Sequence, residues 1–583
     1  MEDMGEIMAE TANRGPVAPK DPTKKRPFFY IMKDKEIFGA PQPDGSFAHF
    51  LYLDMGRLTD AAKLTGNVTD EEMIENLTTR VGLQKMVHSI GVSVSSKEAS
   101  EKTRFVAEMY PKTPGEEATV IEAELAMDGM ETVIELEGVD WKDGDKELGQ
   151  MRFLFDKEGL CATTDVRFYL NDGFEAPEQP EEVAVDFASE GYKKMIGNSL
   201  MQTGNTERLR KVLDKAVSGE DVTLSFIGGS ITQGAGAIPI NEKCYARVFY
   251  EDFVKRYMKG GECTFVKAGV GGTPSELGMI RFERDVLRDG KCEPDLVVIE
   301  FAVNDEGDET QGVCYESLVR KALSLPWKPA VVLLFAVFSN DWNLQDRLSP
   351  VGKNYGLPMV SVLDAVSPQF PLMPKDGRVI SKNQYFYDVY HPSNLGHQIM
   401  ADCLSNLMDV VSAEPLGSDQ GKEISLAEIT PVIGADFEQV ELLDKKEMDA
   451  LKEKYDIAEV VEGSFDQKDE DLQAVEMDKD IEMTPEFPHN WCHEGGSEPF
   501  KMTITCKRLL LIFKDSAAAS HGTAEVYVDG KKVLDADPHV NGWTHCNAVI
   551  LVNEEESRKR EVVIKMKDVD ENKKFTILGF GVC

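Results

Sequence analysis

The sequence predicts an α/β protein in which a doubly wound domain with a parallel sheet is flanked along the chain by β-rich domains. The first observation is the length of 583 residues, which exceeds what one hydrophobic core usually organises. The second is a central series of buried strands separated by helical segments, and the third is apolar–polar alternation on both sides of it. We expect an N-terminal β-sandwich-like domain at 1–200, an α/β domain at 205–412, and an acidic connector with a C-terminal β-sandwich-like domain at 413–583.

The N-terminal region alternates apolar and polar residues in short runs, for example at 118–125, 131–136 and 150–155. Gly, Asp or Pro bounds each run, so period-two patterning predicts antiparallel strands. A helical insertion is expected at 70–87. The segment 173–182, rich in Pro and carboxylates, is the predicted exit linker.

The central region changes to nearly continuous apolar runs, which are typical of strands that helices cover on both faces. A basic helical stretch at 206–216 precedes them. The predicted strands lie at 222–227, 263–267, 295–301, 329–338 and 358–363.

The C-terminal region begins with a strongly acidic segment, 436–483, that contains a predicted helix at 445–455. Strands then return, and an Asp-Gly pair at 529–530 is a good hairpin signal. The predicted strands lie at 501–505, 509–513, 524–528 and 561–566.

The strong negative charge argues against two classes of partner. The chain has 103 Asp and Glu against 64 Lys and Arg, a formal net charge of -39. Such a chain repels the phosphates of nucleic acid and anionic lipid. We therefore expect neither nucleic acid nor a membrane among its partners.

Two features predict a cytoplasmic location. Residues 1–25 are polar and acidic and lack the apolar core of a secretory signal. The ten cysteines include no CxxC pair, which fits reduced thiols better than a disulfide framework.

Ser230 follows the first central strand, in a glycine-rich turn that reads Gly-Gly-Ser-Ile-Thr. The carboxyl ends of the strands are where ligands bind in an open α/β sheet. A serine here can be a nucleophile or a helix cap, and this segment alone does not decide between them. A phosphate-binding loop is disfavoured because no Gly-Lys-Ser/Thr ending follows.

Asp388 and His391 lie three residues apart after the last strand of the same domain. On a tight turn the carboxylate can bind one imidazole nitrogen and leave the other facing a serine hydroxyl. An Asp-x-x-His pair is common by chance, but together with a serine at a strand end it favours nucleophilic catalysis.

Gly272 and Asn304 follow the second and third central strands. An acyl-transfer enzyme needs donors aimed at the developing oxyanion, and a glycine N–H and an asparagine amide can both donate. Taken singly, Gly272 is better explained as a turn glycine and Asn304 as a loop-capping asparagine.

Together these four segments resemble the sequence blocks of the SGNH (GDSL-like) hydrolase superfamily. The resemblance implies a three-layer α/β/α, flavodoxin-like catalytic domain. It implies Ser230 as the nucleophile, with His391 and Asp388 completing the catalytic triad. It further implies an oxyanion hole made of the Ser230 N–H, Gly272 and Asn304. No metal ion and no organic cofactor are implied.

One position departs from the family pattern, because Gly229 stands where the GDSL motif has aspartate. The Gly-Gly-Ser-Ile-Thr form is similar to that of multidomain bacterial acetyl xylan and acetyl mannan esterases. The resemblance therefore implies removal of O-acetyl groups from xylan or related hemicellulose oligosaccharides. The rival α/β-hydrolase fold is disfavoured because Thr232 occupies the position of the second glycine of its nucleophile elbow.

A group of aromatic and imidazole side chains in the C-terminal domain suggests sugar contacts, since aromatic faces stack on sugar rings. The candidate substrate-binding residues are Trp491, His493, Trp543 and His545, with Arg281 on the helix after the Gly272 loop. Each Trp and His is at least as well explained as a core residue, and Arg281 is better explained as an anchor of its helix. A zinc site at His493 lacks recognisable ligand spacing, so we expect no metal.

Two other functions stay open on the sequence alone. The same fold can act as an esterase or lipase on lipid or other small acyl esters, although no amphipathic lid is evident near the four segments. A carbohydrate-binding protein with an inactive SGNH domain is the other alternative, although competent residues fill every triad and oxyanion position.

Overall fold

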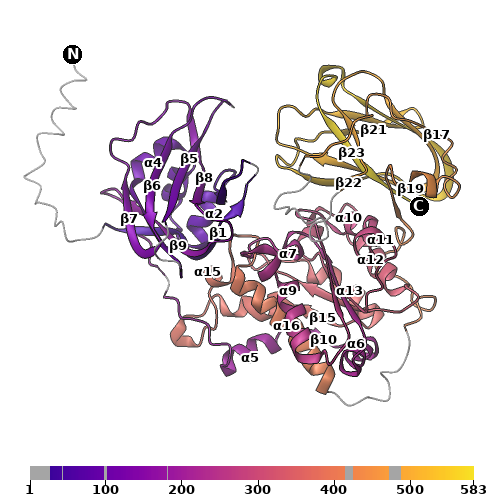
Figure 1. Ribbon diagram of the computed structural model, residues 1–583, viewed down its shortest axis with the longest axis horizontal. Helices are drawn as coiled ribbons and strands as arrows, with labels where there is room; N and C mark the ends of the chain where they lie inside the picture. Colours follow the sequence, from indigo (N-terminus) through magenta and orange to yellow (C-terminus); the bar gives the residue numbers. More distant parts are fainter. Residues whose placement is uncertain are drawn as a thin grey trace, which may run out of the picture. The chain divides into compact units, whose positions relative to one another are not determined.

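The computed structural model describes residues 26–583 except 43, 98–101, 114, 180, 414–423 and 472–486. It divides into two compact units, Met1–Pro180 and Glu181–Cys583 (Figure 1). The boundary falls inside the predicted linker 173–182. The N-terminal segment used to predict the location, and the end of the predicted acidic connector, lie outside the described residues.

The first unit is built from two antiparallel sheets that share one core, which confirms its predicted β-rich character. Phe29 and Phe168 enter this core from one sheet, and Phe105 and Phe153 enter it from the other. One sheet has the order β1 (Phe28–Phe38), β9 (Cys161–Leu170), β4 (Val87–Ser95), β7 (Asp128–Glu135); the second has the order β2 (Ala40–Pro41), β3 (Phe47–Tyr52), β8 (Asp145–Phe155), β5 (Lys102–Pro111), β6 (Val120–Ala126).

The predicted helical insertion is present as two short helices, α3 (Glu71–Leu77) and α4 (Arg80–Met86). The Asp70 side chain accepts from the N–H of Met73 and caps the first helix. A further helix, α2 (Arg57–Leu64), precedes them and was not predicted.

The second unit contains a six-stranded sheet with the order β10-β15-β14-β13-β11-β12. Five strands are parallel and follow the 2-1-3-4-5 order of doubly wound sheets, whereas β10 is antiparallel to β15. The sheet is therefore mixed, not wholly parallel as predicted, because an edge strand can join without a crossover. The strands are β10 (Leu200–Gln202), β11 (Val222–Gly228), β12 (Cys263–Gly269), β13 (Leu296–Glu300), β14 (Ala330–Phe335) and β15 (Met359–Ser361).

Residues 181–200, which we predicted as part of the N-terminal domain, lie in the second compact unit. Helix α5 (Glu190–Gly197) contacts α16 (Asn394–Ala413), and β10 belongs to the six-stranded sheet. The domain limit at residue 200 stays a prediction. The separation of 205–412 from 413–583 stays a prediction, as does the three-layer arrangement.

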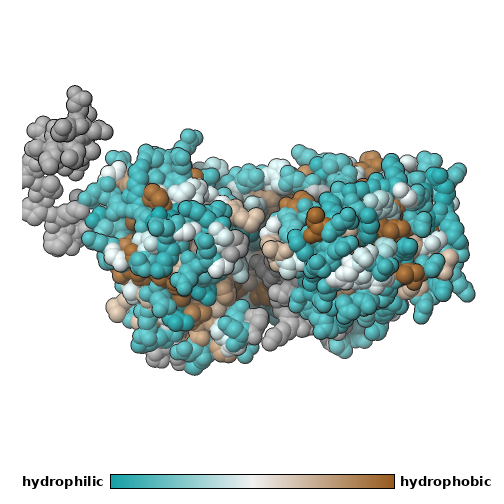
Figure 2. All heavy atoms as spheres, turned by 90° about the horizontal axis from the view of Figure 1, so that it is seen from above, coloured by the Kyte–Doolittle hydropathy of each residue, from teal (hydrophilic) through white to brown (hydrophobic). Residues whose placement is uncertain are grey.

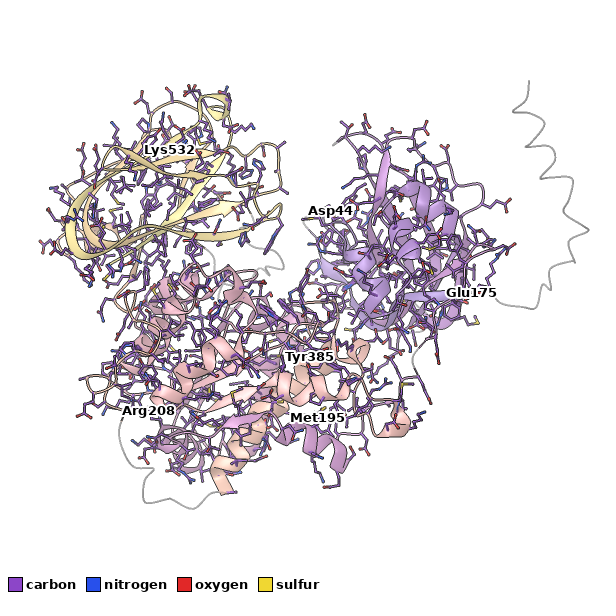
Figure 3. All side chains as sticks on the ribbon, turned by 180° about the vertical axis from the view of Figure 1, so that it is seen from behind. Asp44, Glu175, Met195, Arg208, Tyr385 and Lys532 are labelled. Atoms are coloured by element: carbon purple, nitrogen blue, oxygen red, sulfur yellow. The ribbon has the colours of Figure 1, made fainter. Side chains whose placement is uncertain are left out.

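Helices join the parallel strands and carry buried side chains against them (Figure 3). Met195 on α5 and Tyr385 on α15 are buried, and Arg208 on α6 donates to the carbonyl of Pro329 at 3.0 Å. The helices are α6 (Glu207–Ser218), α7 (Ser230–Gln233), α8 (Ile240–Lys243), α9 (Tyr245–Tyr257), α10 (Ser275–Ile280), α11 (Phe282–Asp285), α12 (Val313–Leu323), α13 (Gln345–Tyr355), α14 (Val362–Val366), α15 (Lys382–Tyr385) and α16 (Asn394–Ala413).

The C-terminal strands form one hydrogen-bonded network of eight. The strands predicted at 501–505 and 509–513 are a single strand, β19 (Phe500–Asp515), with register shifts near Cys506 and Leu509. The predicted helix at 445–455 is shorter, α17 (Met448–Leu451). The other strands are β16 (Glu441–Leu443), β17 (Glu459–Val461), β18 (Trp491–His493), β20 (Ala524–Val528), β21 (Lys531–Ala536), β22 (His545–Met566) and β23 (Phe575–Val582).

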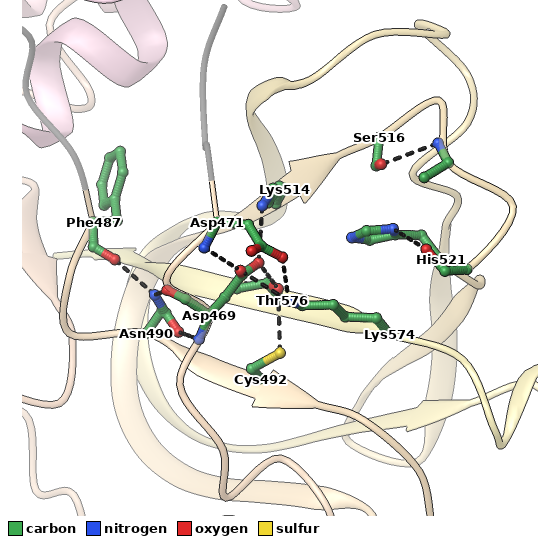
Figure 4. A network of polar contacts seen from close by, with 12 residues as sticks. Asp469, Asp471, Phe487, Asn490, Cys492, Lys514, Ser516, His521, Lys574 and Thr576 are labelled. Atoms are coloured by element: carbon green, nitrogen blue, oxygen red, sulfur yellow. Dashed lines mark hydrogen bonds and ion pairs between the residues drawn. The ribbon is translucent and has the colours of Figure 1, made fainter. Parts of the chain in front are cut away.

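A buried polar network ties the beginning of this region to its strands (Figure 4). The fully buried carboxylate of Asp469 binds the ammonium groups of Lys514 and Lys574, each at 3.0 Å, and the Thr576 hydroxyl at 2.7 Å. Burial alone would raise the pKa of Asp469, but these partners lower it to about 2. The carboxylate therefore stays ionised at neutral pH.

The surface agrees with the acidic composition. Figure 2 shows a face on which hydrophilic residues predominate and hydrophobic residues form small patches. Among the residues that the structure describes, no helix is long and apolar enough to cross a membrane. The cytoplasmic location stays a prediction from the sequence.

Candidate active site

The sheet brings three of the predicted loops to one edge. Gly228 at the end of β11 is paired with Gly269 on one neighbouring strand and with Glu300 on the other. Ser230, Gly272 and Asn304 follow these aligned positions by two, three and four residues. The strand order also reverses between β11 and β13. Ligands usually bind at this point, beyond the carboxyl ends of the strands.

Ser230, His391 and Asp388 form a continuous chain of hydrogen bonds. The Ser230 Oγ lies 3.0 Å from His391 Nε2, and His391 Nδ1 lies 2.8 Å from Asp388 Oδ2. Because an ionised carboxylate only accepts, Nδ1 carries the proton and Nε2 is left to accept from the hydroxyl. The imidazole is thus positioned to remove the serine proton.

The turn around Asp388 holds the carboxylate in its ionised form. Its second oxygen accepts from the backbone N–H groups of Tyr390 and His391, both at 2.8 Å. Burial would raise the pKa of Asp388, but the adjacent imidazole and these N–H groups lower it. A negative charge therefore stays available to stabilise a positive imidazole.

The start of α16 fixes the histidine loop against the serine loop. Asn394 accepts from the N–H of Ile238 at 2.7 Å and donates to its carbonyl at 2.8 Å. His397 Nε2 lies 3.0 Å from the carbonyl of Ala235, and its Nδ1 accepts from the N–H of Tyr245. Burial lowers the pKa of His397 to about 4, so this ring is neutral and acts as a brace. The sequence analysis did not single out these two side chains.

The structure gives a steric reason for Gly229, which stands where the GDSL motif has aspartate. A Cβ built on Gly229 would lie 2.1 Å from Oδ1 of Asn304 and 2.5 Å from its Cγ. The Asn304 amide therefore occupies the space that a side chain at position 229 would need. Glycine at position 229 therefore allows the Ser230 loop and the Asn304 loop to pack closely against each other.

Gly272 lies beneath a tryptophan from the C-terminal strands. A Cβ built on Gly272 would lie 1.9 Å from Cη2 of Trp543, and its φ of +68° is in the left-handed region. The Trp543 ring stacks on His545 with centroids 4.5 Å apart, and His545 Nδ1 lies 2.8 Å from the buried Asp515 carboxylate. Trp543 and His545 thus lie beside the candidate site, and their contact with a substrate stays a prediction.

Two other candidate sugar contacts are core residues instead. Trp491 is 1% exposed, and its indole N–H donates to Glu462. His493 is also buried, with its ring nitrogens 2.8 and 3.0 Å from the carbonyls of Lys573 and Gly496. Both belong to β18, whose side chains are all buried, so neither ring is available to a sugar or a metal ion.

An aromatic group near His391 was missed by the sequence analysis. Tyr390, 47% exposed, packs edge-on against Phe338, which stacks on Trp342. The N–H of Ser339 donates to the carbonyl of Val389, which joins this loop to the histidine turn. No local signal marks the loop, because the contact links segments 50 residues apart in the chain.

Comparison with known proteins agrees with this geometry. The sequence profile of the GDSL-like lipase/acylhydrolase family matches residues 226–399. These residues form a GDSL-like lipase/acylhydrolase domain. The chain is therefore a carboxylic ester hydrolase.

Two solved structures extend the likeness beyond the GDSL-like domain. A two-domain esterase (CEX) active on acetylated mannans is 27% identical, with a TM-score of 0.55, over 66% of this chain and 98% of that chain. The same esterase co-crystallised with mannopentaose gives 27% identity and a TM-score of 0.55 over 66% and 97%. The comparison with curated proteins returns no match.

Arg281 of the GDSL-like domain does not reach a substrate, because its side chain is fully buried. Its guanidinium donates to the carbonyl of Gly228 at 3.0 Å and to that of Ala268 at 2.7 Å. Asp285 accepts from it at 3.1 Å. Arg281 therefore clamps the strand ends that precede the Ser230 and Gly272 loops, which corrects its assignment as a substrate-binding residue.

We expect Arg281→Met to lower the free energy of unfolding by about 3 kcal/mol, because it removes a charged donor from each of two buried carbonyls and breaks the buried ion pair with Asp285. Urea denaturation measures this change. The matched control is Arg247→Met, whose pair with Glu251 is partly exposed and is expected to contribute about 1 kcal/mol or less. Equal losses in the two variants would contradict the clamp.

Proposed function

We propose that the chain is a serine esterase that removes O-acetyl groups from hemicellulose oligosaccharides through Ser230, His391 and Asp388. The observation that carries the proposal is the unbroken series of contacts of 3.0 and 2.8 Å from hydroxyl to imidazole to carboxylate. This series supports nucleophilic attack by serine with histidine as the base.

In the first half of the reaction the Ser230 oxygen attacks the ester carbonyl carbon while its proton passes to His391 Nε2. The carboxylate of Asp388 stabilises the imidazolium that forms. The tetrahedral intermediate then collapses: the bond between the acetyl carbon and the sugar oxygen breaks, and His391 returns its proton to that oxygen. Ser230 is left carrying the acetyl group.

In the second half, His391 takes a proton from water as the water oxygen attacks the acetyl carbon. The bond to Ser230 breaks, acetate leaves, and the proton returns to the serine oxygen. In both halves negative charge develops on the carbonyl oxygen. The Ser230 and Gly272 N–H groups and the Asn304 amide are the donors proposed to stabilise it.

Acetylated mannan is the first candidate substrate, and acetylated xylan is the second. The esterase CEX, which is active on acetylated mannans, shares 27% identity over 98% of its length with this chain. A carbohydrate substrate also fits the two aromatic rings next to site residues, Trp543 over Gly272 and Tyr390 beside His391. Aromatic faces pack well against the apolar faces of sugar rings.

We expect Ser230→Ala to abolish hydrolysis of p-nitrophenyl acetate and release of acetate from acetylated mannan and xylan. Without the hydroxyl no acetyl-enzyme can form. The control, Ser218→Ala, changes an exposed serine on α6 and should leave both activities unchanged. Normal turnover by Ser230→Ala would refute the proposed nucleophile.

We expect Gly229→Ala to lower kcat by about tenfold to a hundredfold, since the new methyl group must displace the Asn304 amide. Steady-state kinetics with p-nitrophenyl acetate measure the change. Gly197→Ala is the matched control, because a Cβ at that position of α5 meets nothing within 4 Å. An unchanged kcat for Gly229→Ala would argue against Asn304 as an oxyanion donor.

We expect Trp543→Ala to raise KM for acetylated mannan oligosaccharides by about tenfold, the loss typical of an aromatic stacking contact. KM for p-nitrophenyl acetate should change little, because that ester has no sugar ring to pack on Trp543. Val540→Ala, an exposed position in the same loop, is the control. Parallel changes on both substrates would assign Trp543 to packing of the Gly272 loop alone.

A further inference from the structure

The first unit carries a second cluster of aromatic and charged side chains, on the four-stranded sheet β1-β9-β4-β7. In this sheet Phe28 is paired with Tyr169, and Tyr30 with Arg167. Their chain neighbours Phe29 and Phe168 are fully buried in the core, so the cluster lies on the opposite face. Neither the family profile, which begins at residue 226, nor the proposed function involves this face.

The cluster lines a cavity of about 330 Å³. This volume is at the lower end of the roughly 300–1,000 Å³ of small-molecule sites. Three aromatic rings and three charged groups contribute to the lining: Phe28, Tyr30, Tyr169, Glu131, Asp165 and Arg167. We call this cavity the sheet groove.

A glycine in the middle of β4, Gly91, lies beneath two of the side chains that line the sheet groove, Glu131 and Tyr169. A Cβ built on Gly91 would lie 2.5 Å from Oε1 of Glu131 and 2.6 Å from Cε2 of Tyr169. Glycine weakens a strand interior, and it often marks a site of close approach. Because Gly91 has no side chain, the side chains of Glu131 and Tyr169 can lie directly over the β4 backbone.

The charged groups of the sheet groove are held rigidly by one another. Arg167 binds Glu131 at 2.9 Å and Asp165 at 2.7 Å, and its guanidinium lies over the Tyr30 ring at 4.9 Å. The Tyr169 hydroxyl donates to both oxygens of Glu131, at 2.8 and 2.9 Å. Burial and the glutamate raise the pKa of Tyr169, so it stays a neutral donor. The polar groups are thus preorganised at neutral pH.

This combination selects for a neutral polyhydroxylated ligand. Two carboxylates against one guanidinium disfavour an anion such as phosphate, and the internally paired charges disfavour a simple cation. Planar carboxylate and guanidinium groups can accept from and donate to several hydroxyls at once, while aromatic rings pack on C–H faces. We propose that the sheet groove is a saccharide-binding site, separate from the GDSL-like domain, that takes one or more neutral sugar units of a polysaccharide.

Native gels containing soluble, deacetylated glucomannan or arabinoxylan test this site in the full chain. The parent protein should be retarded, and Tyr30→Ala should weaken the retardation by about tenfold. Glu131→Gln keeps the shape of the groove and should also weaken the retardation. This variant therefore distinguishes a loss of binding from a loss of folding. Tyr52→Ala, an exposed tyrosine on the other sheet of the same unit, should behave as the parent.

Hydrolysis of p-nitrophenyl acetate, measured on the same samples, should be unchanged in all three variants, so failure of this site is distinct from failure of the proposed catalysis. When Trp543 is already alanine, Tyr30→Ala should still weaken the retardation, because the two sites bind separately. The proposal is overturned if Tyr30→Ala and Glu131→Gln are both retarded as strongly as the parent, or if neither glycan retards the parent.

Discussion

The hydrogen bond between Ser230 Oγ and His391 Nε2 is the interaction on which the rest of the site depends. A serine hydroxyl is a weak nucleophile until a base removes its proton, and these two residues are 161 positions apart in the chain. The side chains of Asn394 and His397 at the start of α16 hold the two loops together by hydrogen bonds to the backbone of Ile238 and Ala235. The proposed chemistry therefore depends on a helix that carries no reacting group itself.

The C-terminal strands contribute to the site as well as to the stability of the second unit. Leu510, Ile512 and Cys546 belong to the same hydrophobic core as the central sheet. This shared core fixes β22 against α10, and the residues just before β22 place Trp543 on Gly272. Packing between the two regions thus shapes the loop that the proposed mechanism uses for oxyanion stabilisation.

Local patterns predicted what depends on local sequence. Apolar runs gave the five parallel strands, and the turn containing Asp388 and His391 is closed by contacts within four residues. The edge strand β10 was not predicted because it has only three residues and no long apolar run. Residue type alone could not show that Trp491 faces a core while Trp543 faces the site, because burial depends on contacts that are distant in the chain.

Covalent labelling with a fluorophosphonate, followed by peptide mass spectrometry, tests whether His391 activates Ser230. Such a reagent reacts with a serine that a neighbouring base activates. We expect one phosphonylated residue, Ser230, with labelling lost in His391→Ala although the serine is still present. Labelling of a different serine, or equal labelling of Ser230 without the imidazole, would contradict it.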